Sequence, residues 1–106
     1  MFAHRLSMYL KNDGAPAFRE KVKNDVIPLL RKQVGFLEQI SFLYMSGREV
    51  HSYSIWESAE AAELFNRKAY PQMAKMLASV IEGTPRMQTY EVLNSTIANP
   101  ERAEVI

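Results

Sequence analysis

The side chains with the clearest chemical potential lie in the segment VHSYSIW, residues 50–56. Because alternate residues of a strand point to the same side, Ser52, Ser54 and Trp56 share one face of this segment. Together they offer two hydroxyl groups and an aromatic surface. His4 adds an imidazole, the side chain most often used as a general base near neutral pH. No histidine and aspartate lie in evident reach of the serines, so a nucleophilic triad has no support.

Composition excludes several other kinds of chemistry. The 106 residues suffice for one domain, and 13 basic residues stand against 12 acidic ones without clustering, so no nucleic-acid partner is expected. The absence of cysteine excludes disulfides and thiolate sites, and two distant histidines do not suggest zinc. No glycine-rich phosphate loop indicates a flavin or a nicotinamide, so no cofactor is expected.

The N-terminal segment MFAHRLSMYL does not have the features of a secretory signal. His4 and Arg5 interrupt any apolar run there, and no stretch approaches the roughly 20 apolar residues of a membrane span. We therefore expect a cytoplasmic protein with no membrane partner.

Hydrophobic spacing predicts alternating strands and helices. Period-two alternation indicates strands at Phe2–Leu10, Phe36–Met45, Glu49–Trp56 and Arg86–Asn94. Spacings of three and four indicate helices at about Ala15–Gln33, from a Ser58 cap through Arg67, and from Pro71 until Gly83. Pro28 removes a backbone donor, so we expect a kink or a restart in the first helix. These elements form a domain of residues 1–94, and residues 95–106 form a tail.

This order predicts an α+β fold, the ferredoxin-like split β-α-β arrangement with a four-stranded antiparallel sheet. Both faces of that sheet carry apolar residues. The second strand is expected to place Phe36, Ile40, Phe42 and Tyr44 on one face and Leu37, Leu43 and Met45 on the other. The third strand sets Tyr53 and Ile55 opposite Val50 and Trp56. Two helical regions cover one face only, so we expect a homodimer, with coverage by the C-terminal tail as the alternative.

The segments IPLLRKQVGF, SIWESAEAAELF and TYEVL resemble the antibiotic biosynthesis monooxygenase (ABM) family. The resemblance covers about residues 2–93, and its most specific part is the tryptophan followed by Glu57 and Ser58. It implies a dimeric α+β barrel. The superfamily includes oxygenases, haem-degrading enzymes and proteins of unknown role, so the pattern indicates the fold more strongly than the activity.

Few of the functional residues known in the ABM family are present at the matching positions of this sequence. In the family's cofactor-independent oxygenases an asparagine, the tryptophan, a tyrosine and an arginine surround the substrate. These positions fall on Ser52, Trp56, Ala62 and about Met76 here. In the haem-degrading branch the asparagine, tryptophan and haem-binding histidine fall on about His4, Phe65 and about Lys75, so haem degradation is not expected.

The resemblance turns the face that carries Trp56 toward the helices, where it lines an apolar cavity with a few polar groups. The predicted catalytic residues are His4 as a base, Ser52 as a hydrogen-bond partner of a phenolate, and Trp56. The predicted substrate-binding residues are Leu6, Met8, Ser54, Phe65, Met73 and Met76. In the alternative interpretation, Trp56 anchors the core, the methionines pack it and His4 is a partly exposed strand residue.

Together these features predict a cofactor-independent monooxygenase, or a related enzyme, that acts on a small aromatic or polyketide-like compound. A non-catalytic homodimeric domain that binds a small hydrophobic molecule is the first alternative. A purely structural dimer is the second. His51 and Tyr53, on the opposite face of their strand, are expected to contact the second subunit.

Overall fold

The computed structural model describes residues 1–45 and 47–97. Its elements follow the predicted alternation of strands and helices. They are β1 (Phe2–Leu10), α1 (Ala15–Lys21), the π-helix η1 (Val22–Val26), α2 (Ile27–Arg31), β2 (Phe36–Leu43), β3 (Glu49–Trp56), α3 (Ala59–Lys68), α4 (Tyr70–Leu77) and β4 (Ile81–Glu91).

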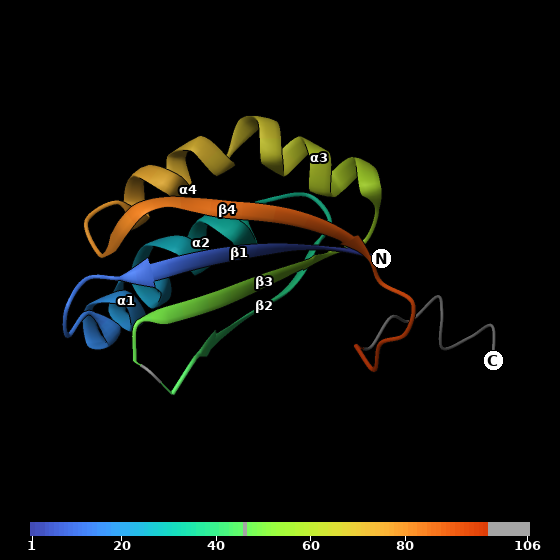
Figure 1. Ribbon diagram of the computed structural model, residues 1–106. Helices are drawn as coiled ribbons and strands as arrows, with labels where there is room; N and C mark the ends of the chain where they lie inside the picture. Colours follow the sequence, from blue (N-terminus) through green and yellow to red (C-terminus); the bar gives the residue numbers. More distant parts are fainter. Residues whose placement is uncertain (46, 98–106) are drawn as a thin grey trace.

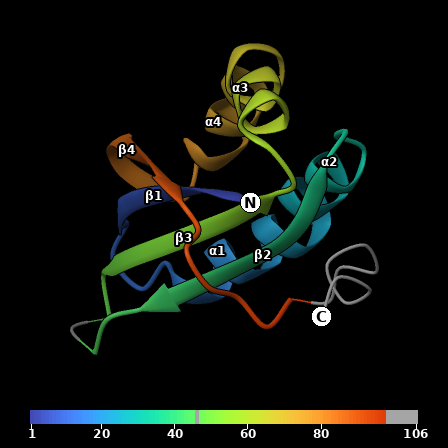
Figure 2. The same ribbon diagram turned by 90° about the vertical axis from the view of Figure 1, so that its right-hand side faces the viewer.

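The sheet is antiparallel and has the strand order β2-β3-β1-β4. Figures 1 and 2 show the helices on one side of this sheet; within residues 1–45 and 47–97 no helix covers the other side, which we call the uncovered face. This is the ferredoxin-like α+β arrangement, so the predicted fold class is confirmed. No helix in the described ranges 1–45 and 47–97 is long and apolar enough to cross a lipid bilayer.

The central strands β1 and β3 bring the predicted site residues side by side. His4 pairs with Ser54, Leu6 with Ser52, and Met8 with Val50. Directly opposite residues in an antiparallel pair point to the same face, so these side chains all face the helices. His4, Leu6, Met8 and Ser54 are buried there, as the alternation predicts.

The first helical region is continuous in backbone conformation from α1 to α2, with η1 in the middle. The backbone N–H of Ile27 donates to the carbonyl of Val22, five residues back. Pro28 follows directly and has no N–H to donate to Asn24, so the ordinary α-helical bond is missing at this point. The irregularity expected at Pro28 therefore takes the form of one wider helical turn just before it.

The predicted boundary between the last helix and the last strand is wrong. The helix ends at Leu77, not at Gly83, and Ile81 already belongs to β4, where it pairs with Leu10. Gly83 has a φ of 69°, and the register of β4 on β1 shifts nearby. Apolar residues at 77, 80 and 81 fit a helical period. Pairing with the free edge of β1 nevertheless provides better partners for the backbone N–H and C=O groups of this segment.

The predicted faces of β2 are also wrong in part, because a bulge interrupts the strand at Leu37. Phe36 pairs with Trp56, but Glu38 already pairs with Ile55. The extra residue exchanges the two faces after Phe36. Phe36 therefore packs on Trp56 on the helix side, whereas Ile40 and Phe42 point to the uncovered side.

The ends of two strands fall short of their predicted positions. β2 stops at Leu43 and β4 at Glu91, instead of Met45 and Asn94. After β4 the N–H of Val92 donates to the carbonyl of Met1 at 2.9 Å, and the chain then runs beyond the start of β1, next to the N-terminus (Figure 1). The predicted tail begins at residue 95, and its residues 98–106 lie outside the described part of the chain.

Candidate functional site

Most of the predicted site residues meet around one small cavity between the sheet and the helices. They are His4, Leu6, Met8, Ser52, Ser54, Phe65 and Met73. The inner cavity, as we call this space, has a volume of about 20 Å³, which is room for about one water molecule. Trp56 and Met76 do not line it: Trp56 is enclosed in the core, and Met76 packs against the core from α4.

Trp56 is held on every side by neighbours from other elements. It stacks on Phe65 of α3 with ring centroids 4.8 Å apart, and Phe36 meets it edge-on at 5.6 Å. Its indole N–H donates to Ser54 Oγ at 2.9 Å, and none of its surface is exposed. A ligand can reach the indole only if one of these side chains moves.

His4 is buried and its ring is fixed by two hydrogen bonds. Nε2 lies 2.9 Å from the carbonyl oxygen of Ala62, and Nδ1 lies 3.1 Å from Thr89 Oγ1. A carbonyl only accepts, so Nε2 carries a proton, and in the neutral ring Nδ1 accepts from the Thr89 hydroxyl. The interpretation of His4 as a partly exposed residue is wrong, since only 3% of it is exposed. Ala62 stands where the resemblance to the ABM oxygenases would place a tyrosine. It contacts His4 through its backbone carbonyl instead of through a side chain.

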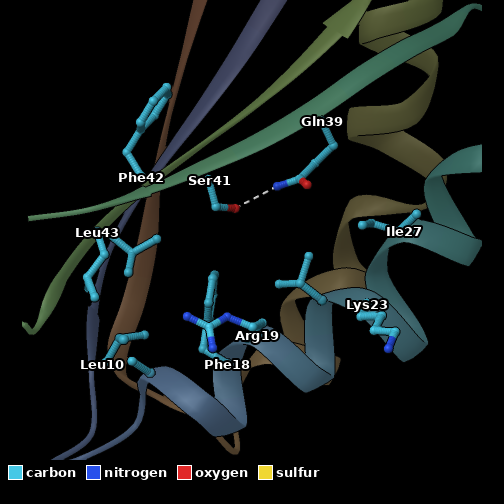
Figure 3. Close-up of a pocket in the computed structure, with 12 residues that line it drawn as sticks. Leu10, Phe18, Arg19, Lys23, Ile27, Gln39, Ser41, Phe42 and Leu43 are labelled. Atoms are coloured by element: carbon cyan, nitrogen blue, oxygen red, sulfur yellow. Dashed lines mark hydrogen bonds between the residues drawn. The ribbon is translucent and has the colours of Figure 1, made fainter.

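A larger cavity lies between α1–η1 and β2, and sequence reasoning did not find it. This outer cavity has a volume of about 290 Å³. Figure 3 shows Phe18 and Arg19 on its helix side and Gln39 and Ser41 on its strand side. Phe18, Val22 and Gln39 line the inner cavity as well, so the two cavities adjoin.

A chain of polar side chains crosses from β2 to β3 at this place. The amide of Gln39 donates to Ser41 Oγ at 2.7 Å, and Ser41 Oγ lies 2.7 Å from Ser52 Oγ (Figure 3 shows the first bond). Either serine can donate to the other. In both arrangements one of the two hydroxyl protons is not used within the chain and can be donated to a ligand oxygen.

The bulge at Leu37 explains why Gln39 and Ser41 were missed. Counted from Phe36, both positions fall on the face away from Phe36, but the bulge turns them toward the helices and toward Ser52. One signal was present in the sequence. The run Gln39-Ile40-Ser41-Phe42 alternates polar and apolar residues, so the side chains of Gln39 and Ser41 had to share a face.

In the described part of the chain, the charges around the outer cavity are all positive. Arg19 and Lys23 line it one helical turn apart, and none of its lining residues is acidic. Beside the inner cavity, burial raises the pKa of the Tyr70 hydroxyl, whose ring meets Phe65 edge-on at 6.5 Å. Within residues 1–45 and 47–97 no group of three histidine, aspartate or glutamate side chains is arranged to hold a metal ion.

The fold and the cavities define a ferredoxin-like α+β domain with an apolar, hydroxyl-bearing space between its sheet and its helices. No family model and no curated protein matches the sequence. Similar folds occur among solved structures.

One is a monooxygenase of Streptomyces coelicolor in complex with the ligand nanaomycin D, at 17% identity and a TM-score of 0.73, covering 92% of each chain. Another is the cofactor-independent oxygenase SnoaB of Streptomyces nogalater, at 14% identity and a TM-score of 0.70, covering 90% of this chain and 95% of that one. A third, from Nitrosomonas europaea, is described as a candidate antibiotic biosynthesis monooxygenase, at 16% identity and a TM-score of 0.70, covering 89% and 100%. These neighbours confirm the fold and support the resemblance to the ABM family at the level of the fold.

Proposed function

We propose that this protein is a cofactor-independent monooxygenase of the ABM type that acts on a small, electron-rich aromatic compound. The observation that carries the proposal is the pair of adjoining cavities, apolar but crossed by the Gln39–Ser41–Ser52 chain. An enzyme of this kind needs a dry space, a partner for a phenolate oxygen and a base. The neighbours described as monooxygenases support the same assignment.

In the proposed reaction a ring methylene beside a phenol loses a proton, and the resulting carbanion reduces dioxygen directly. One oxygen atom becomes the new ring carbonyl, and the other leaves as water with the two methylene hydrogens. Ser52 binds the phenolate oxygen and His4 accepts the proton at Nδ1, which requires Nδ1 to exchange the Thr89 hydroxyl for the substrate. Trp56, Leu6, Met8, Phe65, Met73 and Met76 form the apolar surroundings, and Ser54 holds the Trp56 indole through its hydroxyl oxygen.

Oxygen consumption with a panel of hydroxylated anthrones tests this function. We expect turnover by the wild-type protein and a loss of about 100-fold in His4→Gln, the scale of general-base catalysis. Ser79→Ala, a change at an exposed site outside the cavities, is expected to keep the wild-type rate. Thermal unfolding of each variant separates a lost base from a lost fold. The proposed reaction is rejected if no anthrone is oxidised, or if His4→Gln is folded and fully active.

A non-catalytic small-molecule binder is the second candidate function. It is favoured by the engagement of both His4 ring nitrogens and by the small volume of the inner cavity, about 20 Å³. In this case the ligand occupies the outer cavity alone. Saturable binding of an anthrone without oxygen consumption or product supports this candidate, and product formation excludes it.

We also propose that the protein is a homodimer whose subunits meet through the uncovered face of the sheet. Large apolar side chains on this face are 41–50% exposed, namely Ile40, Phe42, Tyr44 and Tyr90. The Phe42 ring meets Tyr53 edge-on at 6.0 Å, so the patch is continuous across β2 and β3. A second copy with the same face is the simplest partner for such a patch, because a two-fold axis buries both faces at once.

A further inference from the structure

The outer cavity has a positively charged side. Arg19 of α1 and Lys23 of η1 are exposed, stand four residues apart and therefore lie on the same face of the helical region. No aspartate or glutamate is among the residues that line the cavity. Among the residues that the structure describes, a ligand that enters meets two cations and no anion.

The acidic residues of the same helical region are engaged elsewhere. Asp25 forms an ion pair with Lys21 at 3.1 Å, and Glu20 accepts a hydrogen bond from Asn24 at 3.3 Å. Among the described residues, Arg19 and Lys23 form no ion pair. Asp25 thus neutralises Lys21, whereas Arg19 and Lys23, which line the cavity, are available to a ligand.

The rest of the wall favours flat apolar groups. Leu10, Phe18, Val22, Ile27, Leu43 and Val50 line the cavity. Its volume of about 290 Å³ lies just below the range of about 300–1,000 Å³ that is usual for small-molecule sites, so the ligand is compact. The free hydroxyl proton of the Ser41–Ser52 pair adds a donor on the strand side. Arg19, Lys23 and the Ser41–Ser52 pair can each donate to, or attract, a negatively charged oxygen.

We propose that the outer cavity selects a compact aromatic anion, with its carboxylate or phenolate group toward Arg19 and Lys23 and its rings against Phe18 and Val22. The inference rests on the site of the proposed function and narrows its substrate class from aromatic compounds to ionised ones. For the oxygenase reaction the same cations stabilise the phenolate form, which is the form that donates electrons to dioxygen.

A pair of probes with the same shape and different charge tests this selectivity. The affinities of 2-naphthoate and of neutral 2-naphthamide are measured by calorimetry under anaerobic conditions, at low and at high salt. We expect the wild-type protein to bind the naphthoate about tenfold more tightly at low salt, with the preference shrinking at high salt because the cations are exposed. Turnover plays no part in this measurement, so a failed oxygenase assay and a failed anion preference are distinguishable.

The variant Arg19→Gln/Lys23→Gln is expected to lose the preference and to keep its affinity for the amide. The matched control, Arg31→Gln/Lys32→Gln, removes the same charge from exposed positions that do not line the cavity, and it is expected to keep the preference. Equal binding of the two probes by the wild-type protein, or a preference that survives in the first variant, overturns the proposal. Failure of the wild-type protein to bind either probe also overturns it.

Discussion

The contacts of Trp56 predict a large structural role for a single side chain. It joins β3 to α3 through its stacking on Phe65, and it also supports β2 through Phe36. Trp56→Ala is expected to lower the free energy of unfolding by about 3–5 kcal/mol, since the surrounding aromatic rings cannot collapse fully into the space. Urea unfolding followed by far-ultraviolet circular dichroism measures the loss without relying on tryptophan fluorescence.

The matched variant Trp56→Phe retains an aromatic ring and loses the indole N–H that Ser54 accepts. We expect it to be clearly more stable than Trp56→Ala. Equal losses for the two variants would mean that the ring contacts contribute little and that the hydrogen bond dominates.

The burial of Tyr70 predicts that the free energy of unfolding depends on pH in the alkaline range. Burial raises the pKa of its hydroxyl above the ordinary value of 10.0. As the pH rises, the unfolded chain therefore loses this proton before the folded one does, and the free energy of unfolding decreases. The contribution of the protonated Tyr70 hydroxyl to the free energy of unfolding is fully present below the pKa of Tyr70 in the unfolded chain. It is lost as the pH rises through the pKa of Tyr70 in the folded protein.

Tyr70→Phe is expected to remove this part of the alkaline decline. The measurement is the free energy of unfolding of both proteins between about pH 9 and pH 11, where tyrosine begins to ionise. Tyr9→Phe, at an exposed position, controls for the loss of a phenol. Parallel curves for Tyr70→Phe and the wild-type protein would contradict the prediction.

At the scale of the elements, the junction between α2 and β2 depends on close packing at Gly35. Its φ is 80°, and a Cβ placed there would lie 2.5 Å from the Cβ of Ala61 in α3. The N–H of Glu57 also donates to the Gly35 carbonyl at 2.8 Å. The backbone of this loop therefore forms the contact surface for the start of α3, where Ser58 Oγ accepts from the N–H of Ala61 as the predicted N-cap.

Gly35→Ala is expected to cost more than about 2 kcal/mol, because it adds a steric overlap to the strain of a left-handed residue. Gly47→Ala is the matched control, since Gly47 has a φ of 85° but, apart from its chain neighbours, no described residue has an atom within 4 Å of the added Cβ. We expect only the conformational cost of about 1–2 kcal/mol there. Chemical denaturation of both variants gives the comparison, and similar losses would show that the packing against Ala61 is relaxed easily.

At the scale of the whole molecule, the uncovered face of the sheet determines assembly. We expect the wild-type protein to be a dimer in native mass spectrometry and in analytical ultracentrifugation. Phe42→Glu places a charge in the proposed interface and is expected to raise the dissociation constant by more than about 100-fold.

Val34→Glu is the control for this change. Val34 is 75% exposed and lies between α2 and β2, away from the face of the sheet. The variant is expected to remain dimeric. A wild-type monomer at micromolar concentration, or a Phe42→Glu dimer, would remove the proposed interface while leaving the cavities and their test untouched.

The amount that could be predicted from the sequence differs between strands. The period-two pattern grouped the side chains on the faces of β1 and β3 correctly, since neither strand contains a bulge where they pair and His4, Ser52 and Ser54 follow the simple alternation. The resemblance to the ABM family then turned that face toward the helices. In β2 the same argument was wrong beyond Phe36, because one extra residue at Leu37 exchanges the faces. Gln39 and Ser41 were missed for this reason, and the outer cavity with them.

The sequence by itself determined the order of the elements, the fold class and which residues of β1 and β3 share a face. Local periodicity is sufficient for these features, because each element must bury its own apolar side. Only the tertiary structure decided where α4 ends and β4 begins. It also decided that the β2 bulge turns Gln39 and Ser41 toward the helices, and that Arg19 and Lys23 line a cavity. These features depend on pairing and packing between residues distant in the chain, and no local pattern contains that information.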